Sequence, residues 1–310
     1  MILLTGASGF IGKNFISSAG RNISRAVIRR DYLNQFQFLY PEIDFFTIDK
    51  LTADTEWGGA FNSCQAVIHL AGLAHSSDYS EVDFRTINFE GTINLASAAA
   101  KAGVKRFVFV STIGVNGTST LGRPFSPLSD PVPHNYYAQS KYDTELALKK
   151  ISFETGLELV IVRPTLVYGP DAPGNFGLLA KLLKNFSILP FGLATNKRDF
   201  ISVQNLADLL MICATHPNAA GHIFLASDCE TVSIKHFINA IAEGLGKRVF
   251  QLPIPVSLIR LVGKLTGKST VVEQLFGNLQ VDSSNIKEVL DWTPPLTMKQ
   301  AMATLRDSGK

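Results

Sequence analysis

The stretch Thr5-Gly6-Ala7-Ser8-Gly9-Phe10-Ile11-Gly12 lies between a short apolar run at residues 2–4 and a helical pattern at residues 11–19. Its three glycines are spaced three residues apart. This spacing suits a tight turn, a close approach of the backbone to a pyrophosphate, and close packing of the helix on the strand. The start of the helix would offer N–H groups and the positive end of its dipole to phosphate oxygens. The pattern predicts a dinucleotide site contacted by Gly6, Ser8, Gly9, Phe10, Ile11 and Gly12.

Around this turn, short β-branched and aromatic runs alternate with longer helical patterns through the first half of the chain. Strands that are apolar on both faces and separated by helices indicate a parallel sheet covered on both sides. We therefore predict an α/β fold with a Rossmann-type, doubly wound parallel sheet. The expected strands are residues 2–4, 26–28, 45–48, 66–70, 107–110 and 159–162, and the expected helices are residues 11–19, 86–101 and 137–154.

The texture of the chain changes after Pro164, where Gly-Pro, Pro-Gly and Leu-Pro pairs interrupt it often. Such pairs mark turns and loops. We expect a smaller C-terminal α/β region that binds the substrate. The predicted division is a dinucleotide-binding domain at residues 1–165, rejoined by later residues at about 199–215, and a mainly substrate-binding domain at residues 166–310.

Composition narrows the classes of partner. The chain has 29 basic and 26 acidic residues in 310, a net charge of +3 without a basic block, so no nucleic-acid partner is expected. Three scattered cysteines without a CxxC or HExxH pattern predict a reducing, cytoplasmic compartment and no metal site. No apolar run is long enough to span a membrane. The apolar segment at residues 252–276 carries four charged residues, which favours a soluble subdomain with an apolar face over a membrane contact.

The residues that follow the second and third strands bear on the choice of cofactor. Arg29 and Arg30 stand 17 and 18 residues after Gly12, where an acidic residue would bind the ribose of NAD and an arginine would pair with the 2′-phosphate of NADP. We therefore favour NADP over NAD, although Asp31 follows directly. Asp49 is placed to accept from the adenine amino group. Leu51 and the small residues after the fourth strand complete the expected cofactor contacts, namely Leu70, Ala71 and Gly72.

Tyr137 and Lys141 form a pair with catalytic potential. They are four residues apart in a predicted helix, so they share one face. A nearby ammonium lowers the pKa of a phenol, which would let Tyr137 serve as acid or base nearer neutral pH. Thr112 follows the fifth strand, and its hydroxyl is expected at the same edge of the sheet, beside the reacting oxygen. We also expect Tyr137 and Lys141 to touch the cofactor, and Thr112 to touch the substrate.

Six motifs in order now point to a family. They are TGASGFIG (5–12), HLAG (69–72), NFEGT (88–92), VSTIGVNG (110–117), YAQSK (137–141) and RPTLVYGP (163–170). The chain resembles the extended short-chain dehydrogenases/reductases over essentially its whole length. Within them it is most similar to the NAD-dependent epimerase/dehydratase family acting on nucleotide sugars.

The resemblance implies further site residues. Thr112, Tyr137 and Lys141 match the catalytic residues of the family, and Asn88 matches a helix asparagine that supports the site. Pro164 stands where the family packs backbone against the nicotinamide. In the substrate region, Asn175 and Arg198 match residues that contact the substrate diphosphate. Two features depart from the pattern. Arg29-Arg30 stand where 4-epimerases usually carry an acidic residue. The residues just before Asp282 (276–281, FGNLQV) contain no arginine, which leaves the second phosphate contact unassigned.

The implied function is a nucleotide-sugar epimerase, acting at C4 of a UDP-hexose or UDP-N-acetylhexosamine through a transient 4-keto sugar. An NADPH-dependent reductase of nucleotide 4-keto sugars in surface-polysaccharide synthesis uses the same residues and stays open as an alternative. A different class, a non-enzymatic dinucleotide sensor, would commonly lack the Tyr137–Lys141 pair. The resemblance also suggests a homodimer formed through the helices at residues 86–101 and 137–154.

Overall fold

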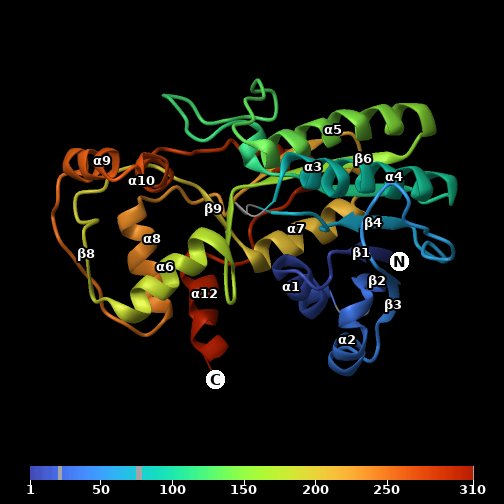
Figure 1. The fold of residues 1–310 in the computed structure, drawn as a ribbon, viewed down its shortest axis with the longest axis horizontal. Coiled ribbons are helices and arrows are strands. Elements are labelled where there is room, and N and C mark those ends of the chain that lie inside the picture. Colours follow the sequence, from blue (N-terminus) through green and yellow to red (C-terminus); the bar gives the residue numbers. More distant parts are fainter. Residues whose placement is uncertain (20–22, 75–78, 310) are drawn as a thin grey trace.

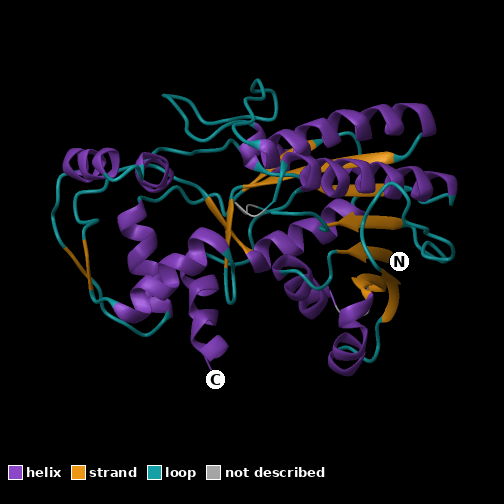
Figure 2. Ribbon diagram, in the orientation of Figure 1, coloured by secondary structure: helices purple, strands orange, loops and turns teal. Residues whose placement is uncertain are grey.

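A seven-stranded sheet forms the centre of the computed structural model, which describes residues 1–19, 23–74 and 79–309. All its neighbouring strands pair in parallel, in the order β10-β6-β5-β4-β1-β2-β3. From β1 the chain adds β2 and β3 on one side and then β4, β5 and β6 on the other, which is the doubly wound arrangement. Figures 1 and 2 show the sheet on one side of the molecule. Its strands are β1 (Ile2–Thr5), β2 (Ile23–Arg29), β3 (Asp44–Ile48), β4 (Ala66–His69), β5 (Arg106–Val110), β6 (Glu158–Pro164) and β10 (Ile223–Ala226).

Helices cover both faces of this sheet. On one face α1 (Phe10–Ala19) packs against α7 (Val203–Thr215), and on the other lie α4 (Gly91–Lys101) and α5 (Tyr136–Thr155) (Figure 1). Strands β1, β4 and β5 are buried at every residue, as a sheet with two covered faces requires. The α/β, Rossmann-type fold predicted from the sequence is confirmed.

The helix expected at residues 86–101 begins earlier and changes its winding. It starts as α3 (Glu81–Phe84), which is capped by reciprocal bonds between Ser80 and Asp83. A π-helical segment, η3 (Arg85–Glu90), then leads into α4. The wider winding buries Asn88. Such π-segments are frequent at functional sites.

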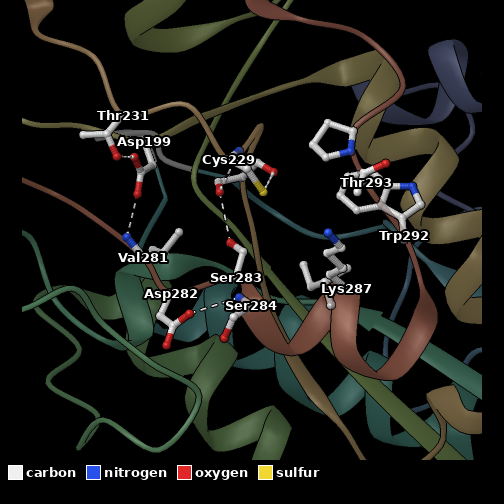
Figure 3. A pocket seen from close by; sticks show the side chains of 13 residues that line it. Asp199, Cys229, Thr231, Val281, Asp282, Ser283, Ser284, Lys287, Trp292 and Thr293 are labelled. Carbon is white, nitrogen blue, oxygen red and sulfur yellow. Dashed lines mark hydrogen bonds between the residues drawn. The ribbon is translucent and has the colours of Figure 1, made fainter.

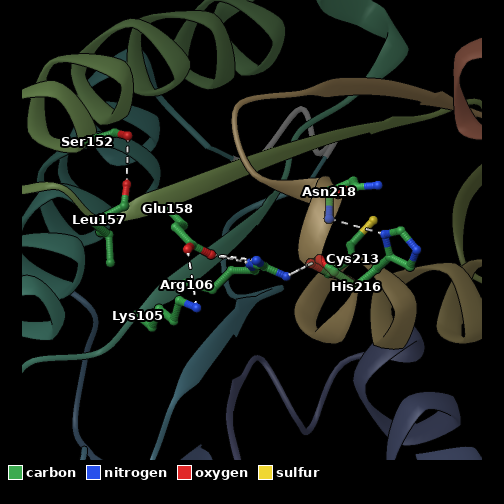
Figure 4. A network of polar contacts seen from close by, with 8 residues as sticks. All are labelled: Lys105, Arg106, Ser152, Leu157, Glu158, Cys213, His216 and Asn218. Atoms are coloured by element: carbon green, nitrogen blue, oxygen red, sulfur yellow. Dashed lines mark hydrogen bonds and ion pairs between the residues drawn. The ribbon is translucent and has the colours of Figure 1, made fainter. Parts of the chain in front are cut away.

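The seventh strand, β10, was not predicted, because it comes from the C-terminal half of the chain. It pairs with β6 at the sheet edge, and the adjoining α7 packs on the same sheet. Arg106, at the start of β5, ties these parts together (Figure 4). Its guanidinium donates to Glu158 at 2.9 Å, and it also donates to the His216 carbonyl just after α7.

The short helix α2 (Leu33–Leu39) lies next to β3, and most of the other elements form a second lobe beside the carboxyl edge of the sheet (Figure 1). Its core is aromatic, and Phe200 stacks on Phe237 with ring centroids 3.8 Å apart. Tyr168 and Phe176 complete the cluster. The lobe contains β7 (Leu166–Tyr168), α6 (Gly174–Asn185), β8 (Ile188–Leu189), β9 (Phe200–Ser202), α8 (Ile234–Gly244), β11 (Phe250–Gln251), α9 (Val256–Leu265), α10 (Ser269–Phe276) and α12 (Met298–Ala303), while α11 (Ser284–Leu290) lies against β10.

Candidate active site

The glycine turn between β1 and α1 is compact because its backbone packs directly on the backbone of neighbouring segments. A Cβ on Gly12 would lie 2.2 Å from the Gly6 carbonyl oxygen, and one on Gly6 would lie 2.6 Å from the Ala71 nitrogen. Neither position can accept a side chain without moving the main chain. The turn therefore presses the start of α1 against the loop after β4. An exposed Gly9 stands at the start of α1, and the whole arrangement fits a dinucleotide pyrophosphate.

A buried polar chain fixes the end of β4. His69 shares hydrogen bonds with the Thr5 hydroxyl at 2.6 Å and the Thr92 hydroxyl at 2.8 Å. Burial, with the nearby Lys141 charge, holds the pKa of His69 well below its usual range, so the ring is neutral. Its role is to join β1, β4 and α4. Leu70 and Ala71 follow half-buried, and Gly72 is exposed.

Thr112, Tyr137 and Lys141 meet at the carboxyl end of β5. Asn135 caps α5 by accepting from the Ala138 N–H at 2.8 Å. The cap fixes the start of the helix and so places Tyr137 in its first turn. The Thr112 hydroxyl hydrogen-bonds the Tyr137 phenol. The Lys141 ammonium donates to the Val110 carbonyl at 2.9 Å and lies 4.7 Å from the centre of the Phe109 ring.

The acidities of this pair differ from the prediction. Burial raises the pKa of Tyr137 to about 12, although the hydrogen bond with Thr112 acts in the opposite direction. The expectation that Lys141 lowers this pKa is therefore wrong for the protein alone. The cause is that burial disfavours the phenolate and that the ammonium is directed at Val110. Burial also lowers the pKa of Lys141 to about 8, with Glu145 opposing the change.

Asn88 joins the loop after β4 to helix α5. Its amide oxygen accepts from the Leu73 N–H at 2.7 Å, and its amide nitrogen donates to the Leu73 carbonyl and to the Ser140 hydroxyl. Every polar atom of this buried side chain is thus used within the protein. Asn88 fixes the distance between Gly72 and α5.

A buried ion pair below Lys141 was missed by the sequence analysis. Glu145, one turn further along α5, accepts hydrogen bonds from Nε and Nη2 of Arg163 in β6, at 2.9 and 2.5 Å. Arg163 also donates to the Asn116 side chain at 3.0 Å. Two signals could have revealed it: a glutamate four residues after Lys141 on one helix face, and an arginine within the apolar strand LVIVRP, which needs a partner once buried.

The residues predicted to select the cofactor have partners within the protein. Arg29 donates to the Tyr32 hydroxyl at 2.8 Å and lies over that ring. Arg30 pairs with Asp49 at 2.9 Å, and both side chains are largely exposed. Leu51 is buried against Gly91 at the start of α4. Arg29, Arg30 and Asp49 thus gather beyond the ends of β2 and β3, on one side of the glycine turn.

Asn175 and Arg198, predicted to contact the substrate diphosphate, lie in the second lobe, and Pro164, predicted as a cofactor contact, ends β6. Arg198 is buried and precedes β9. Its guanidinium donates to the Gly277 carbonyl at 2.9 Å, and burial lowers its pKa to about 10. Asn175 is exposed in the first turn of α6. Pro164 ends β6 opposite Ala226 of β10. The structure therefore brings Thr112, Tyr137, Lys141 and Asn88 together, and it sets Asn175 and Arg198 on separate elements of the other lobe.

A cavity of about 450 Å³ opens next to Asp199, the neighbour of Arg198. Figure 3 shows Cys229, Asp282, Lys287 and Trp292 on its walls. It does not include the predicted catalytic residues, and sequence reasoning did not predict it. Within residues 1–19, 23–74 and 79–309, no cluster of metal-ligating side chains occurs. No helix of that described part is long and apolar enough to cross a membrane.

Comparison with known proteins places this geometry in a family. The model of the NAD dependent epimerase/dehydratase family matches residues 2–226. The chain is 39% identical to a UDP-glucose 4-epimerase of Vibrio cholerae, over 96% of this chain and 92% of that protein. A UDP-glucose 4-epimerase of Thermotoga maritima, solved with UDP-glucose, has the same fold, with a TM-score of 0.74, 22% identity and coverage of 100% and 99%.

A second solved structure with this fold is the enzyme WbmG of Bordetella bronchiseptica in complex with NAD and UDP. Its TM-score is 0.73 at 21% identity, over 99% of this chain and 93% of that one. The family match covers the glycine turn, the Thr112–Tyr137–Lys141 group and all seven strands of the sheet. The chain therefore belongs to the NAD-dependent epimerase/dehydratase family of extended short-chain dehydrogenases/reductases.

Proposed function

We propose that this protein is an NAD-dependent nucleotide-sugar 4-epimerase whose substrate is a UDP-hexose or UDP-N-acetylhexosamine. The observation that carries the proposal is the contact of Thr112 with Tyr137, beside the buried ammonium of Lys141. The name of the Vibrio cholerae relative supports the same reaction.

In this proposal Tyr137 exchanges a proton with the oxygen at C4 of the sugar. Thr112 is positioned to hydrogen-bond the same oxygen, because its hydroxyl already contacts the phenol. Lys141, one turn after Tyr137 along the same helix, is our proposed contact for the nicotinamide ribose. A bound NAD would supply the hydride acceptor and, in its reduced form, the hydride donor for a transient 4-keto sugar. Asn88 keeps the loop at Gly72 in place for this exchange.

For cofactor binding, we propose the glycine turn for the pyrophosphate and the residues at Leu70–Gly72 for the adjoining ribose. Family membership supports NAD. The preference for NADP, inferred from Arg29 and Arg30, is not supported by it, and both guanidinium groups have protein partners. Binding of NADH tighter than NADPH would support this choice, which a fluorescence titration of the two reduced cofactors measures.

A reductase of nucleotide 4-keto sugars is a second candidate, because Arg30 pairs with Asp49 only at an exposed position, where a 2′-phosphate could displace the carboxylate. The two functions differ in what the purified protein does without added reductant. An epimerase interconverts the two 4-epimers of a UDP-sugar and keeps its cofactor. A reductase consumes one NADPH for each 4-keto sugar. Arg198 and Asn175 are our proposed contacts of the substrate diphosphate in both cases.

The phenol provides the direct test. Tyr137→Phe should lower the rate of UDP-sugar 4-epimerisation by about 100-fold or more, since positioned acid–base groups contribute at least that factor. Tyr136→Phe, an exposed neighbour on the same turn, is the matched control and should keep full activity. Cofactor titration should give similar affinities for both variants. Normal turnover in Tyr137→Phe would contradict the assignment.

We also propose the homodimer through α4 and α5. The supporting observation is that α5 leaves Leu146 and Phe153 exposed, the latter at 92%. Light scattering of the wild type and of Phe153→Ser would show whether this face joins two copies.

A further inference from the structure

Helix α9 carries an apolar face that points away from the protein. Leu258, Leu261, Val262 and Leu265 are 50%, 53%, 52% and 79% exposed. Their spacing of i, i+3, i+4 and i+7 places them on one side of the helix. The opposite side is already packed: Val256 and Ile259 contact the aromatic core, and Gly263 lies against Val272 of α10. The four outward residues therefore do not take part in packing α9 on the protein.

The helix and the turn after it carry three basic residues, Arg260, Lys264 and Lys268, and no acidic residue stands between Val256 and Val272. Arg260 is paired with Glu273 of α10. Lys264 and Lys268 are exposed beside the apolar stripe.

We propose that α9 docks this protein on the surface of an anionic lipid bilayer, with the helix parallel to the membrane plane. An apolar stripe flanked by lysines is the pattern of interfacial helices. The helix has 10 residues, or about 15 Å, which is half of what a membrane span needs. A second copy of this chain fits the α9 face less well than a bilayer, because two such faces in contact would bring their lysines together. This proposal departs from the sequence-based preference for a soluble subdomain without membrane contact.

Docking through α9 would place the bilayer near the segment that holds Arg198, one of the proposed substrate contacts. The α9–α10 pair lies at the end of the second lobe, away from β2 and β3 (Figure 1). α10 ends at Phe276, and the next residue, Gly277, accepts the hydrogen bond of Arg198. A bilayer under α9 would therefore lie beside the segment that holds the buried arginine. The docking does not depend on the proposed epimerase activity.

Cosedimentation with lipid vesicles tests the proposal. The full-length protein should bind vesicles of phosphatidylglycerol mixed with phosphatidylcholine more tightly than vesicles of phosphatidylcholine alone. Binding should weaken at 1 M salt, where the screening length falls to about 3 Å. The double variant Leu261→Gln/Leu265→Gln should lose about tenfold or more in affinity. Lys264→Gln and Lys268→Gln should each lose about fivefold.

The matched control is Leu39→Gln/Leu178→Gln, which changes two helical leucines elsewhere that are 52% and 66% exposed and should bind like the wild type. Thermal unfolding and UDP-sugar turnover in detergent-free solution should be unchanged in all these variants. No binding by the wild type, or equal binding by Leu261→Gln/Leu265→Gln, would overturn the proposal. So would a dimer that dissociates in that variant, since the face would then belong to a second copy.

Discussion

Lys141 carries its charge in surroundings that disfavour it. The side chain is buried, its ammonium donates to one carbonyl, and burial lowers its pKa to about 8 from an ordinary value of 10.5. In the unfolded chain the same group stays protonated to about pH 10. Between these two values the unfolded state binds more protons than the folded state, so folding is favoured as the pH rises.

This difference predicts a pH dependence of stability. From pH 7 to pH 10, the free energy of unfolding of the wild type should rise relative to that of Lys141→Met, by up to about 3 kcal/mol. The variant has no group that titrates at this position, so the other titrations largely cancel. Urea unfolding of both proteins without cofactor, at several pH values, measures the difference. A constant or falling difference would show that Lys141 stays charged in the fold.

At the scale of residues, the sequence predicted which side chains meet but not their acidities. The spacing of Tyr137 and Lys141 places both on one helix face, and the order of motifs brings Thr112 to them. The direction of the Tyr137 pKa depends on burial and on where the ammonium points, namely at Val110. Neither quantity can be derived from spacing along a helix.

The turn between β1 and α1 is an element in which side chains have no room. Gly12→Ala should weaken cofactor binding and lower the free energy of unfolding by about 1–3 kcal/mol, because the new methyl group would overlap the Gly6 carbonyl. Gly58→Ala is the matched control, since its methyl group would meet nothing within 4 Å. NADH fluorescence titration and urea unfolding give the two quantities. Equal behaviour of the two variants would contradict the packing argument.

The contact between α5 and β6 depends on one buried ion pair. Glu145→Gln should cost about 3–5 kcal/mol in the free energy of unfolding, because Arg163 would keep a buried charge without its partner. Glu154→Gln removes an exposed pair with Lys150 on the same helix and should cost less than about 1 kcal/mol. Urea unfolding compares them. Similar losses in both would mean that water reaches Arg163.

At the scale of elements, apolar periodicity predicted most of the first half of the chain but missed the short helix α2 (Leu33–Leu39). The six expected strands and three helices are present, with ends that move by a few residues. The π-helical segment at Arg85–Glu90 could not be predicted, because its wider winding follows from the polar contacts of Asn88 with Leu73 and Ser140. These contacts form between residues far apart in the sequence.

The central sheet is assembled from both halves of the molecule. β10 and α7 come after residue 165, yet β10 completes the sheet edge and α7 covers its face. The division of the chain into residues 1–165 and 166–310 remains a proposal, and these returning elements limit it. Sequence patterns predicted that residues near 199–215 rejoin the first domain. The strand β10 was missed, although it is as long as β1 and β4, because it stands outside the regular alternation of strands and helices in the first half of the chain.

A truncation tests this dependence. The fragment of residues 1–165 should fail to fold cooperatively, since it would expose the sheet face that Leu206, Leu209 and Leu210 cover. A fragment of residues 1–226 keeps α7 and β10 and serves as the comparison. Urea unfolding followed by near-ultraviolet circular dichroism distinguishes the two. A sharp transition in the shorter fragment would show that the first domain is autonomous.

The cavity beside Asp199 has a practical consequence. Cys64 and Cys213 are buried, whereas Cys229 is exposed on the cavity wall. A thiol-reactive dye would therefore attach to the native chain at a single position, without any engineered cysteine. Partial desolvation of its thiol, together with the charges of Asp228 and Asp199, raises the pKa of Cys229. The coupling therefore needs mildly alkaline buffer. A dye attached there would report on events in the second lobe while Thr112, Tyr137 and Lys141 stay unmodified.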